Sequence, residues 1–250
     1  ELLNLTQHDT SIEAIEPFEP DQETKEFVMN LAEAINENFL KHMPEDKESY
    51  SAHELADLFR EILDTEFRDE ETGLNAAEGW RVDVEKATVI TVKASEKRIV
   101  IPDDAKIRSR EEVRSLIAHE IGTHMLLSVM GGETNVAPHA IGGPGYYDFE
   151  EGLGTIMGQA INRKFKPANA DAYILAGAAH FDGHDFRDLF EIKWRLSLLS
   201  KDTIDVMSEN VEKVQEAAYG STLRIERGTD EDPWLKDTAY SNGEEIAWKY

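Results

Sequence analysis

The chain has 250 residues, of which 40% are hydrophobic, so it is long enough to bury a core of its own. It has no cysteine, which excludes disulfides and thiolate metal sites and leaves imidazole and carboxylate as ligands for a transition metal. Lys and Arg number 26 against 51 Asp and Glu, and the net charge of −25 argues against nucleic acid and anionic membranes as partners.

Hydropathy gives no sign of a membrane segment. No stretch approaches the roughly 20 uninterrupted apolar residues that a membrane-spanning helix requires. The first residues, ELLNLTQHDTSIEAIEPFEPD, lack the basic and apolar regions of a secretory signal. We therefore expect a soluble, cytoplasmic protein, and the sequence leaves its oligomeric state open.

Two amphipathic helices are predicted in the first third of the chain. Apolar residues recur at three- and four-residue spacing over 21–41, and Pro44 follows this helix. A second helix is predicted to begin at Ser51, because Ser51 and Glu54 occupy the positions of a capping box.

Strands are predicted next, over residues 79–102 with the sequence GWRVDVEKATVITVKASEKRIVIP. Its β-branched residues alternate with a period of two, which is typical of strands. We expect a small antiparallel sheet of two or three strands that ends at Pro102.

Helices dominate the rest of the chain. Ser109 and Glu112 form a second capping box before a helix that is predicted to continue through Met130 and to stop at Gly131 and Gly132. Further helices are predicted near residues 148–164, 170–181, 185–200 and 203–219, and the tail 221–250 is expected to be irregular or extended. This order predicts an α+β fold in which helix dominates.

One of these helices carries the motif His119-Glu120-Ile121-Gly122-Thr123-His124, which has one residue more than the familiar H-E-x-x-H. On a regular α-helix, residues five apart differ by about 500° of rotation, which puts the two imidazoles roughly 140° off a common face. A π-bulge with i to i+5 bonding would bring both onto one side, and we expect the distortion at Gly122.

A third ligand is expected from the next helix. Catalytic zinc normally has three protein ligands, and Glu150 and Glu151 lie near the start of that helix, beyond a Gly- and Pro-rich loop. Adjacent helical residues diverge by about 100°, so one of the two can coordinate well while the other supports it or lies at the surface. Spacing alone does not choose between them.

Two His and one Glu leave the fourth position on zinc to a water, whose pKa zinc lowers toward ~7. Glu120 is predicted to take its proton and to return it to a leaving amine, which makes amide hydrolysis the natural reaction. Alternatives are an aminopeptidase or endopeptidase on the same site, another divalent ion with the same ligands, or a non-catalytic regulatory domain in which four side chains close a structural zinc site.

Three segments, HEIGTH, GGPGYYDFEEGLG and RIERGTDEDPWLKDTAY, resemble the tyrosine carboxypeptidase family that includes the microtubule-associated tubulin-detyrosinating enzyme. Its bacterial members are often called QEGLA-motif proteins. The resemblance runs from about Gly79 to the C-terminus. It implies a zincin-like and gluzincin-like zinc metallopeptidase with an HExxxH active-site helix, Glu151 as the third ligand, and release of a terminal Tyr or Phe.

The chain departs from that family in two ways. The QEGLA pattern reads Glu150-Glu151-Gly152-Leu153-Gly154, with Glu in place of Gln and Gly in place of Ala. The strong negative charge also argues against an acidic, tubulin-like tail as substrate. We expect residues 76–250 to form the zinc metallopeptidase catalytic domain and residues 1–75 to form an N-terminal helical region packed on it, in one compact unit.

The expected substrate is a peptide or protein C-terminus, whose carboxylate needs a cation beyond the metal. The match of the tail to the family implies that the cations are Arg224, Arg227 and Lys236. Tyr240 in the same tail could donate a hydrogen bond to the oxyanion. An alternative of equal weight is that these cations balance nearby Asp and Glu. His139 lies in the loop between the two ligand helices and could contact substrate.

Overall fold

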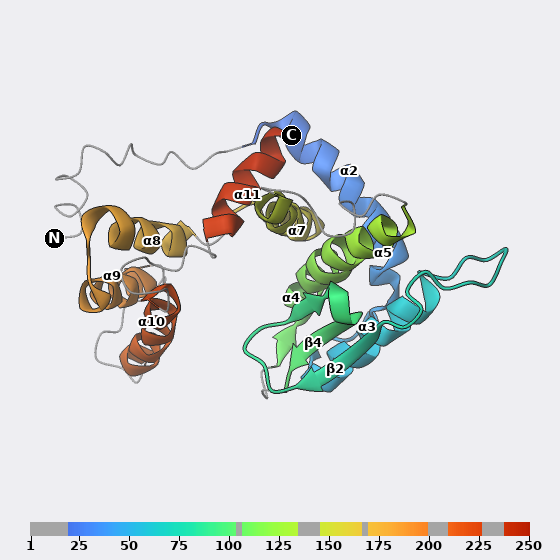
Figure 1. The fold of residues 1–250 in the computed structure, drawn as a ribbon, viewed down its shortest axis with the longest axis horizontal. Helices are drawn as coiled ribbons and strands as arrows, with labels where there is room; N and C mark the ends of the chain where they lie inside the picture. Colours follow the sequence, from blue (N-terminus) through green and yellow to red (C-terminus); the bar gives the residue numbers. More distant parts are fainter. Residues whose placement is uncertain (1–19, 104–106, 135–145, 167–169, 200–209, 227–237) are drawn as a thin grey trace. The chain divides into compact units, whose positions relative to one another are not determined.

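A computed structural model describes residues 20–103, 107–134, 146–166, 170–199, 210–226 and 238–250 (Figure 1). These residues form two compact units. The larger unit contains residues 20–166 and 243–250, and the smaller unit contains the described residues between 170 and 242. Among the described residues, no helix is both long enough and apolar enough to cross a membrane.

The larger unit begins with the two predicted helices. Helix α2 (Gln22–Asn38) starts at Asp21, whose carboxylate accepts a hydrogen bond from the backbone N–H of Thr24 at 2.8 Å. A 3₁₀ turn, η1 (Leu40–His42), follows, and then strand β1 (Ser49–Tyr50) and helix α3 (Ala52–Thr65). The predicted capping box of Ser51 and Glu54 is confirmed, and α3 buries an apolar face that includes Leu55, Phe59 and Ile62.

The main sheet has three strands in the order β2-β4-β3. They are β2 (Arg81–Glu85), β3 (Thr91–Lys93) and β4 (Arg98–Pro102), with the 3₁₀ turn η2 (Ala94–Glu96) between the last two. The prediction of an antiparallel sheet is wrong for one pair, because β4 runs antiparallel to β3 but parallel to β2. Residues 99–101 are buried, and the continuous apolar strand β4 lies in the centre of the sheet. Two consecutive hairpins would instead have placed β3 in the centre. As predicted, the sheet ends at Pro102.

A second, two-stranded sheet leads into the motif helix. Strand β5 (Arg108–Ser109) pairs antiparallel with β1 and is followed by helix α4 (Arg110–Leu116), whose predicted Ser109–Glu112 capping box is confirmed. The helix continues as a π-helix, η3 (Ile117–Met125), and then as α5 (Leu126–Glu133). The predicted stop is two glycines early: α5 includes Gly131 and Gly132, and the break comes at Thr134, whose backbone is extended.

Helix α7 (Tyr146–Asn162) packs on α2, α4 and η3. The shared core combines buried residues of these helices with those of α3 and the sheet. Residues 243–250, the end of helix α11 (Thr238–Lys249), belong to the same unit, and the Trp248 ring lies 5.7 Å from that of Phe165. The apolar face of α2 and the motif helix thus meet α7 across one core.

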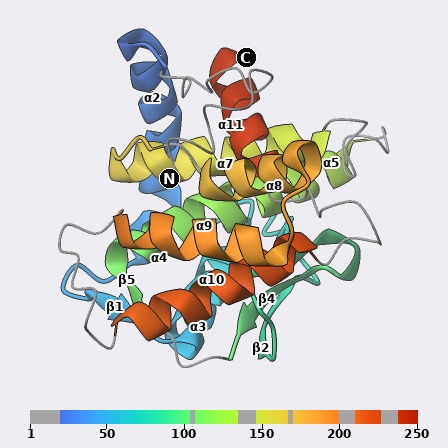
Figure 2. The same cartoon turned by 90° about the vertical axis from the view of Figure 1, so that its left-hand side faces the viewer.

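The smaller unit consists of helices α8 (Ala170–Asp182), α9 (Phe186–Leu199) and α10 (Asn210–Glu226), together with the first turn of α11. The three long helices pack on one another (Figure 2) around a small cluster made of Leu175, Ala178, Leu189 and Ile225. The predicted helices are confirmed here, except that residues 203–209 lie outside the described part.

The expectation of an irregular or extended tail is wrong for residues 221–226 and 238–249. Residues 221–226 complete α10, and residues 238–249 form α11. The Ser, Asn and Gly residues at 241–243 suggested a loop, but Ala239, Gly243 and Ala247 recur every four residues and give the helix a face that packs closely. The fold is therefore α+β and mostly helical, as predicted.

Candidate metal centre

The motif helix is distorted where the sequence predicts it to be. Residues 117–125 form a π-helix, and the hydroxyl of Thr123 donates to the carbonyl oxygen of Ala118, five residues earlier, at 3.0 Å. Gly122 lies within this segment, and a Cβ atom there would come 2.8 Å from Cδ1 of Ile35 on α2. Glycine at this position therefore lets α2 pack closely against the widened helix.

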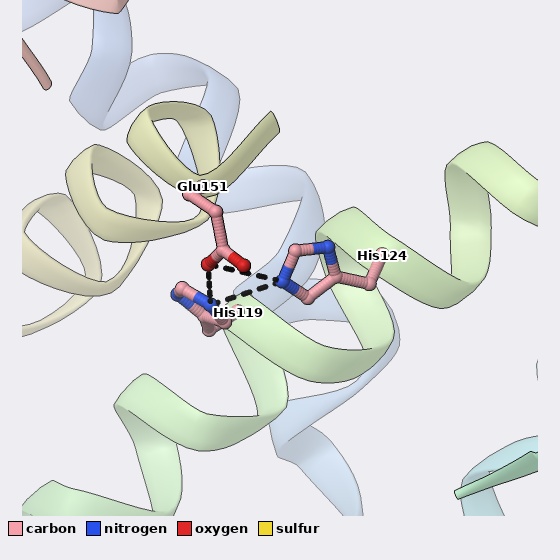
Figure 3. Close-up of side chains that lie close together, drawn as sticks. All are labelled: His119, His124 and Glu151. Carbon is pink, nitrogen blue, oxygen red and sulfur yellow. Dashed lines mark hydrogen bonds and ion pairs between the residues drawn. The ribbon is translucent and has the colours of Figure 1, made fainter. Parts of the chain in front are cut away.

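The widened helix brings both motif imidazoles to one side (Figure 3). Their Nε2 atoms are 3.1 Å apart, and the ring centroids are separated by 4.8 Å with an interplanar angle of 71°. Oε2 of Glu151, on α7, lies 3.4 Å from Nε2 of His119 and 3.6 Å from Nε2 of His124. Three potential ligand atoms from two helices thus converge on one point.

The three residues fit a metal ion on two grounds. Oε2 of Glu151 is buried and receives no hydrogen bond of normal geometry, although both imidazoles lie within ion-pair distance. In addition, ligand atoms held about 2.1 Å from zinc at tetrahedral angles lie about 3.4 Å from one another. The observed separations of 3.1, 3.4 and 3.6 Å bracket that value.

Glu150 and Glu151 take different positions in the cluster. Glu151 faces the two Nε2 atoms, whereas Oε1 of Glu150 lies 2.8 Å from Nδ1 of His124, on the opposite edge of that ring. A carboxylate on the second nitrogen of a ligating histidine fixes its tautomer and orientation and makes it a stronger ligand. Of the two glutamates that sequence spacing could not rank, Glu151 thus lies with the Nε2 atoms and Glu150 lies behind the His124 ring.

Charge and burial shift the pKa values of the cluster. Burial lowers the pKa of His124, but the carboxylates of Glu150 and Glu151, with Glu120 beyond them, outweigh it and raise this pKa to about 10. Burial raises the pKa of Glu151, but His119 and His124 outweigh it, so its pKa falls well below the ordinary value. Without a metal, His124 and Glu151 therefore stabilise each other as ions.

Glu120 follows the first histidine and is buried, with 8% of its surface exposed. Burial raises the pKa of its carboxyl group, while the nearby His119 and His124 act in the opposite direction. Glu120 and His119 also line the same cavity. A buried carboxylate with a raised pKa, beside a cavity, has the properties of a general base.

Two glycines of α7 shape the site, and sequence reasoning gave them no role. A Cβ atom on Gly154 would lie 2.7 Å from Nδ1 of His119, and one on Gly152 would lie 2.6 Å from the backbone nitrogen of Glu244 on α11. Glycine is unfavourable inside a helix, so glycines at 152, 154 and 158 within one helix were the signal that could have indicated close approach.

The predicted substrate-binding residues lie elsewhere in the chain. Arg224 is partly buried on α10, and Tyr240 is partly buried in the first turn of α11; both belong to the smaller unit. The other three candidates, His139, Arg227 and Lys236, lie outside the described residues. Contact of these five residues with substrate stays a prediction.

Comparison with known proteins identifies one family. The family model described as microtubule-associated tyrosine carboxypeptidase matches residues 16–246. The match covers both compact units and includes His119, Glu120, His124 and Glu151. No curated protein and no solved structure matches the chain.

Proposed function

Since the chain belongs to the microtubule-associated tyrosine carboxypeptidase family, we propose that it is a zinc-dependent carboxypeptidase that hydrolyses the last peptide bond of a peptide or protein. The observation that carries the metal assignment is the set of separations among His119, His124 and Glu151, which match the edges of a zinc tetrahedron. Two imidazoles and one carboxylate are also a ligand set typical of catalytic zinc.

Each residue of the cluster has its own part in this proposal. His119, His124 and Glu151 hold the ion, and Glu150 keeps His124 oriented through Nδ1. When bound, zinc supplies Lewis acidity, which lowers the pKa of water and polarises a peptide carbonyl. Among the described residues only these three ligands converge, which favours a fourth position open to water and substrate.

Glu120 is the general base. Its carboxylate takes a proton from the attacking water and then donates it to the amine that leaves. Burial supports this role, because a raised pKa brings the proton affinity of the carboxyl closer to what proton transfer near neutral pH requires. Excluding bulk water from Glu120 also strengthens its interaction with the developing charges.

The substrate is a chain with a free C-terminus. The family's description points to a terminal tyrosine, and we extend the preference to phenylalanine because the two side chains differ by one hydroxyl group. A net charge of −25 repels acidic tails at ordinary ionic strength, so we propose a neutral or basic peptide as the preferred substrate.

The proposal is tested by metal analysis together with cleavage of a peptide that ends in Tyr. The wild-type chain should bind one zinc ion per molecule and release free tyrosine. Glu120→Gln should retain zinc and lose roughly 10²- to 10⁴-fold in rate, whereas His119→Ala should lose both zinc and activity. Exposed Glu70→Gln is the matched control and should behave as the wild type.

Mass spectrometry of the products separates this function from its alternatives. Shortening of a labelled peptide from its N-terminus, or cleavage in its middle, would replace the carboxypeptidase with another peptidase on the same site. Stoichiometric zinc without any turnover, and an E120Q variant equal to the wild type, would favour a structural metal site instead.

A further inference from the structure

A cavity of about 490 Å³ lies between the motif helix and α7. His119 and Glu120 line it, so it borders the candidate metal centre, and Glu111, Lys164 and Lys166 line it as well. Its volume is within the range of roughly 300–1,000 Å³ that is usual for sites of small ligands. One cavity therefore contains the proposed base and two cations.

The α7 wall of this cavity has little side-chain bulk. Gly154 and Gly158 are four residues apart, so they lie on the same face of the helix, and both line the cavity. At Gly154 the His119 ring excludes a side chain, but a Cβ atom at Gly158 would lie 3.5 Å from Cβ of Ser115, which is an ordinary contact. Packing does not require glycine at 158, and its absent side chain leaves the cavity open.

The cavity has the length of a chain end. Gly154 and Asn162 both line it and are eight residues apart on α7, which corresponds to about 12 Å of helix. The single residue beyond the last peptide bond covers roughly 3.5 Å of extended chain, and a lysine side chain can span much of the remainder. A peptide whose last bond lies at Glu120 can thus extend its terminal carboxylate toward Lys164 and Lys166.

The two lysines differ in how they are partnered. Lys164 forms an ion pair with Glu111, which neutralises much of its charge. The ammonium group of Lys166 has no ion-pair partner among the described residues, in a chain with twice as many acidic as basic groups. Gln159 donates to the carbonyl oxygen of Lys166 at 2.7 Å and to Glu244 at 2.7 Å, which anchors the Lys166 backbone to α7 and α11.

We propose that Lys166 binds the terminal carboxylate of the substrate, with Lys164 adding a second, partly neutralised charge at the same end of the cavity. The inference rests on the proposed function, because it assumes that the scissile bond lies at Glu120. It assigns carboxylate recognition to a residue of the larger unit, beside the metal ligands, and it makes a free carboxylate the feature that distinguishes substrates from other peptides.

Binding can be measured without turnover in an E120Q background loaded with zinc. The probe is an N-acetylated tripeptide that ends in Tyr, used as the free acid and as the C-terminal amide. Lys166→Gln should weaken binding of the acid roughly tenfold or more and leave the amide unchanged. Lys166→Arg should restore most of the preference for the acid, because it keeps the charge.

Two further variants complete the test. Lys164→Gln should weaken binding of the free-acid peptide less than K166Q does. Exposed Lys86→Gln, a matched control outside the cavity, should leave binding of both peptides unchanged. Gly158→Ala should fold, since its methyl group meets only ordinary contacts. It should weaken binding of the free-acid and the amide peptide alike, because it narrows the cavity.

The outcomes separate this inference from the function on which it rests. If the wild-type enzyme releases tyrosine and K166Q binds acid and amide as its parent does, Lys166 is not the carboxylate site and the carboxypeptidase stands. If the wild type binds zinc but cleaves no peptide at its C-terminus, the proposed function fails and the assignment of Lys166 fails with it.

Discussion

Gly154 lies so close to His119 that a Cβ atom at position 154 would be 2.7 Å from the ring nitrogen Nδ1 and 2.8 Å from Cε1. Helix α7 approaches the His119 ring this closely because position 154 has no side chain. The glycine that departs from the QEGLA pattern is thus part of the geometry of the candidate metal centre.

Gly154→Ala should displace the His119 ring and weaken zinc binding by tenfold or more, because a shift of a few tenths of an ångström already moves Nε2 away from the position that the other two ligands define. Competition with a chromogenic chelator measures this affinity. The substitution should not unfold the protein, since the ring can rotate away.

Gly132→Ala is the control for this variant, because a Cβ atom at position 132 meets nothing within 4 Å. It should bind zinc as the wild type does and gain up to ~1 kcal/mol in stability from the higher helix propensity of alanine. A G154A variant with unchanged zinc affinity would show that the close approach of α7 is not needed for metal binding.

Glu150 should matter for metal affinity although it is not proposed as a ligand. Its carboxylate contacts Nδ1 of His124 at 2.8 Å, and loss of such an outer partner typically costs 10- to 100-fold in metal affinity. Glu150→Ala should show this loss, and Glu150→Gln should show less of it, because the amide oxygen still accepts the Nδ1 hydrogen bond. Equal zinc affinities for the wild type, E150A and E150Q would show that Glu150 does not support the metal site.

The convergence of the two motif histidines could be predicted from the sequence because it depends on local rules. A spacing of five residues has one helical solution, the π-bulge, and the structure has it at residues 117–125. The choice between Glu150 and Glu151 could not be made in the same way. It depends on how α7 is rotated against the motif helix, which is set by contacts between distant residues such as those of Gly154 and Gly152.

The two errors in the predicted fold also arise from contacts between residues that are distant in the sequence. The parallel pairing of β2 with β4 depends on which strand the core buries most completely, and an alternating pattern does not report the order of strands. Helix α11 was missed because Gly243 disfavours a helix by propensity alone, yet tertiary contact with α7 requires glycine at that position. Local preference was overridden by packing in both cases.

The capping box of α3 should make stability depend on pH in the acid range. A hydrogen bond from Lys47, followed by those from the backbone and hydroxyl of Ser51, lowers the pKa of Glu54 to about 2. A carboxyl whose pKa is lowered in the folded state stabilises it above the unfolded value near 4.5, and this contribution is lost as the pH falls toward 2.

Glu54→Gln isolates this effect, because glutamine can form the same capping box without a charge. The wild type should be more stable than E54Q at pH 7, and the difference should shrink between pH 4.5 and pH 2. Urea unfolding at several pH values measures it. A difference that is constant over this range would mean that the charge of Glu54 does not contribute.

The crossing of α7 and α11 should be the position where the larger unit least tolerates a methyl group. A Cβ atom on Gly243 would collide with the carbonyl oxygen of Asp148, and one on Gly152 would collide with that of Gly243, so the two backbones are in direct contact. Gly243→Ala must separate the helices, and overpacking of this kind costs about 3 kcal/mol.

The same substitution should also reach the metal centre. Gly152 directly follows Glu151, so a displacement of α7 at this point moves the carboxylate away from the imidazoles. Zinc affinity should therefore fall together with stability. Urea unfolding and chelator competition on one preparation measure both quantities, with G132A as the control. Loss of stability without loss of zinc affinity would show that α11 contributes to the fold but not to the metal site. Loss of both would show that the end of α11 positions Glu151.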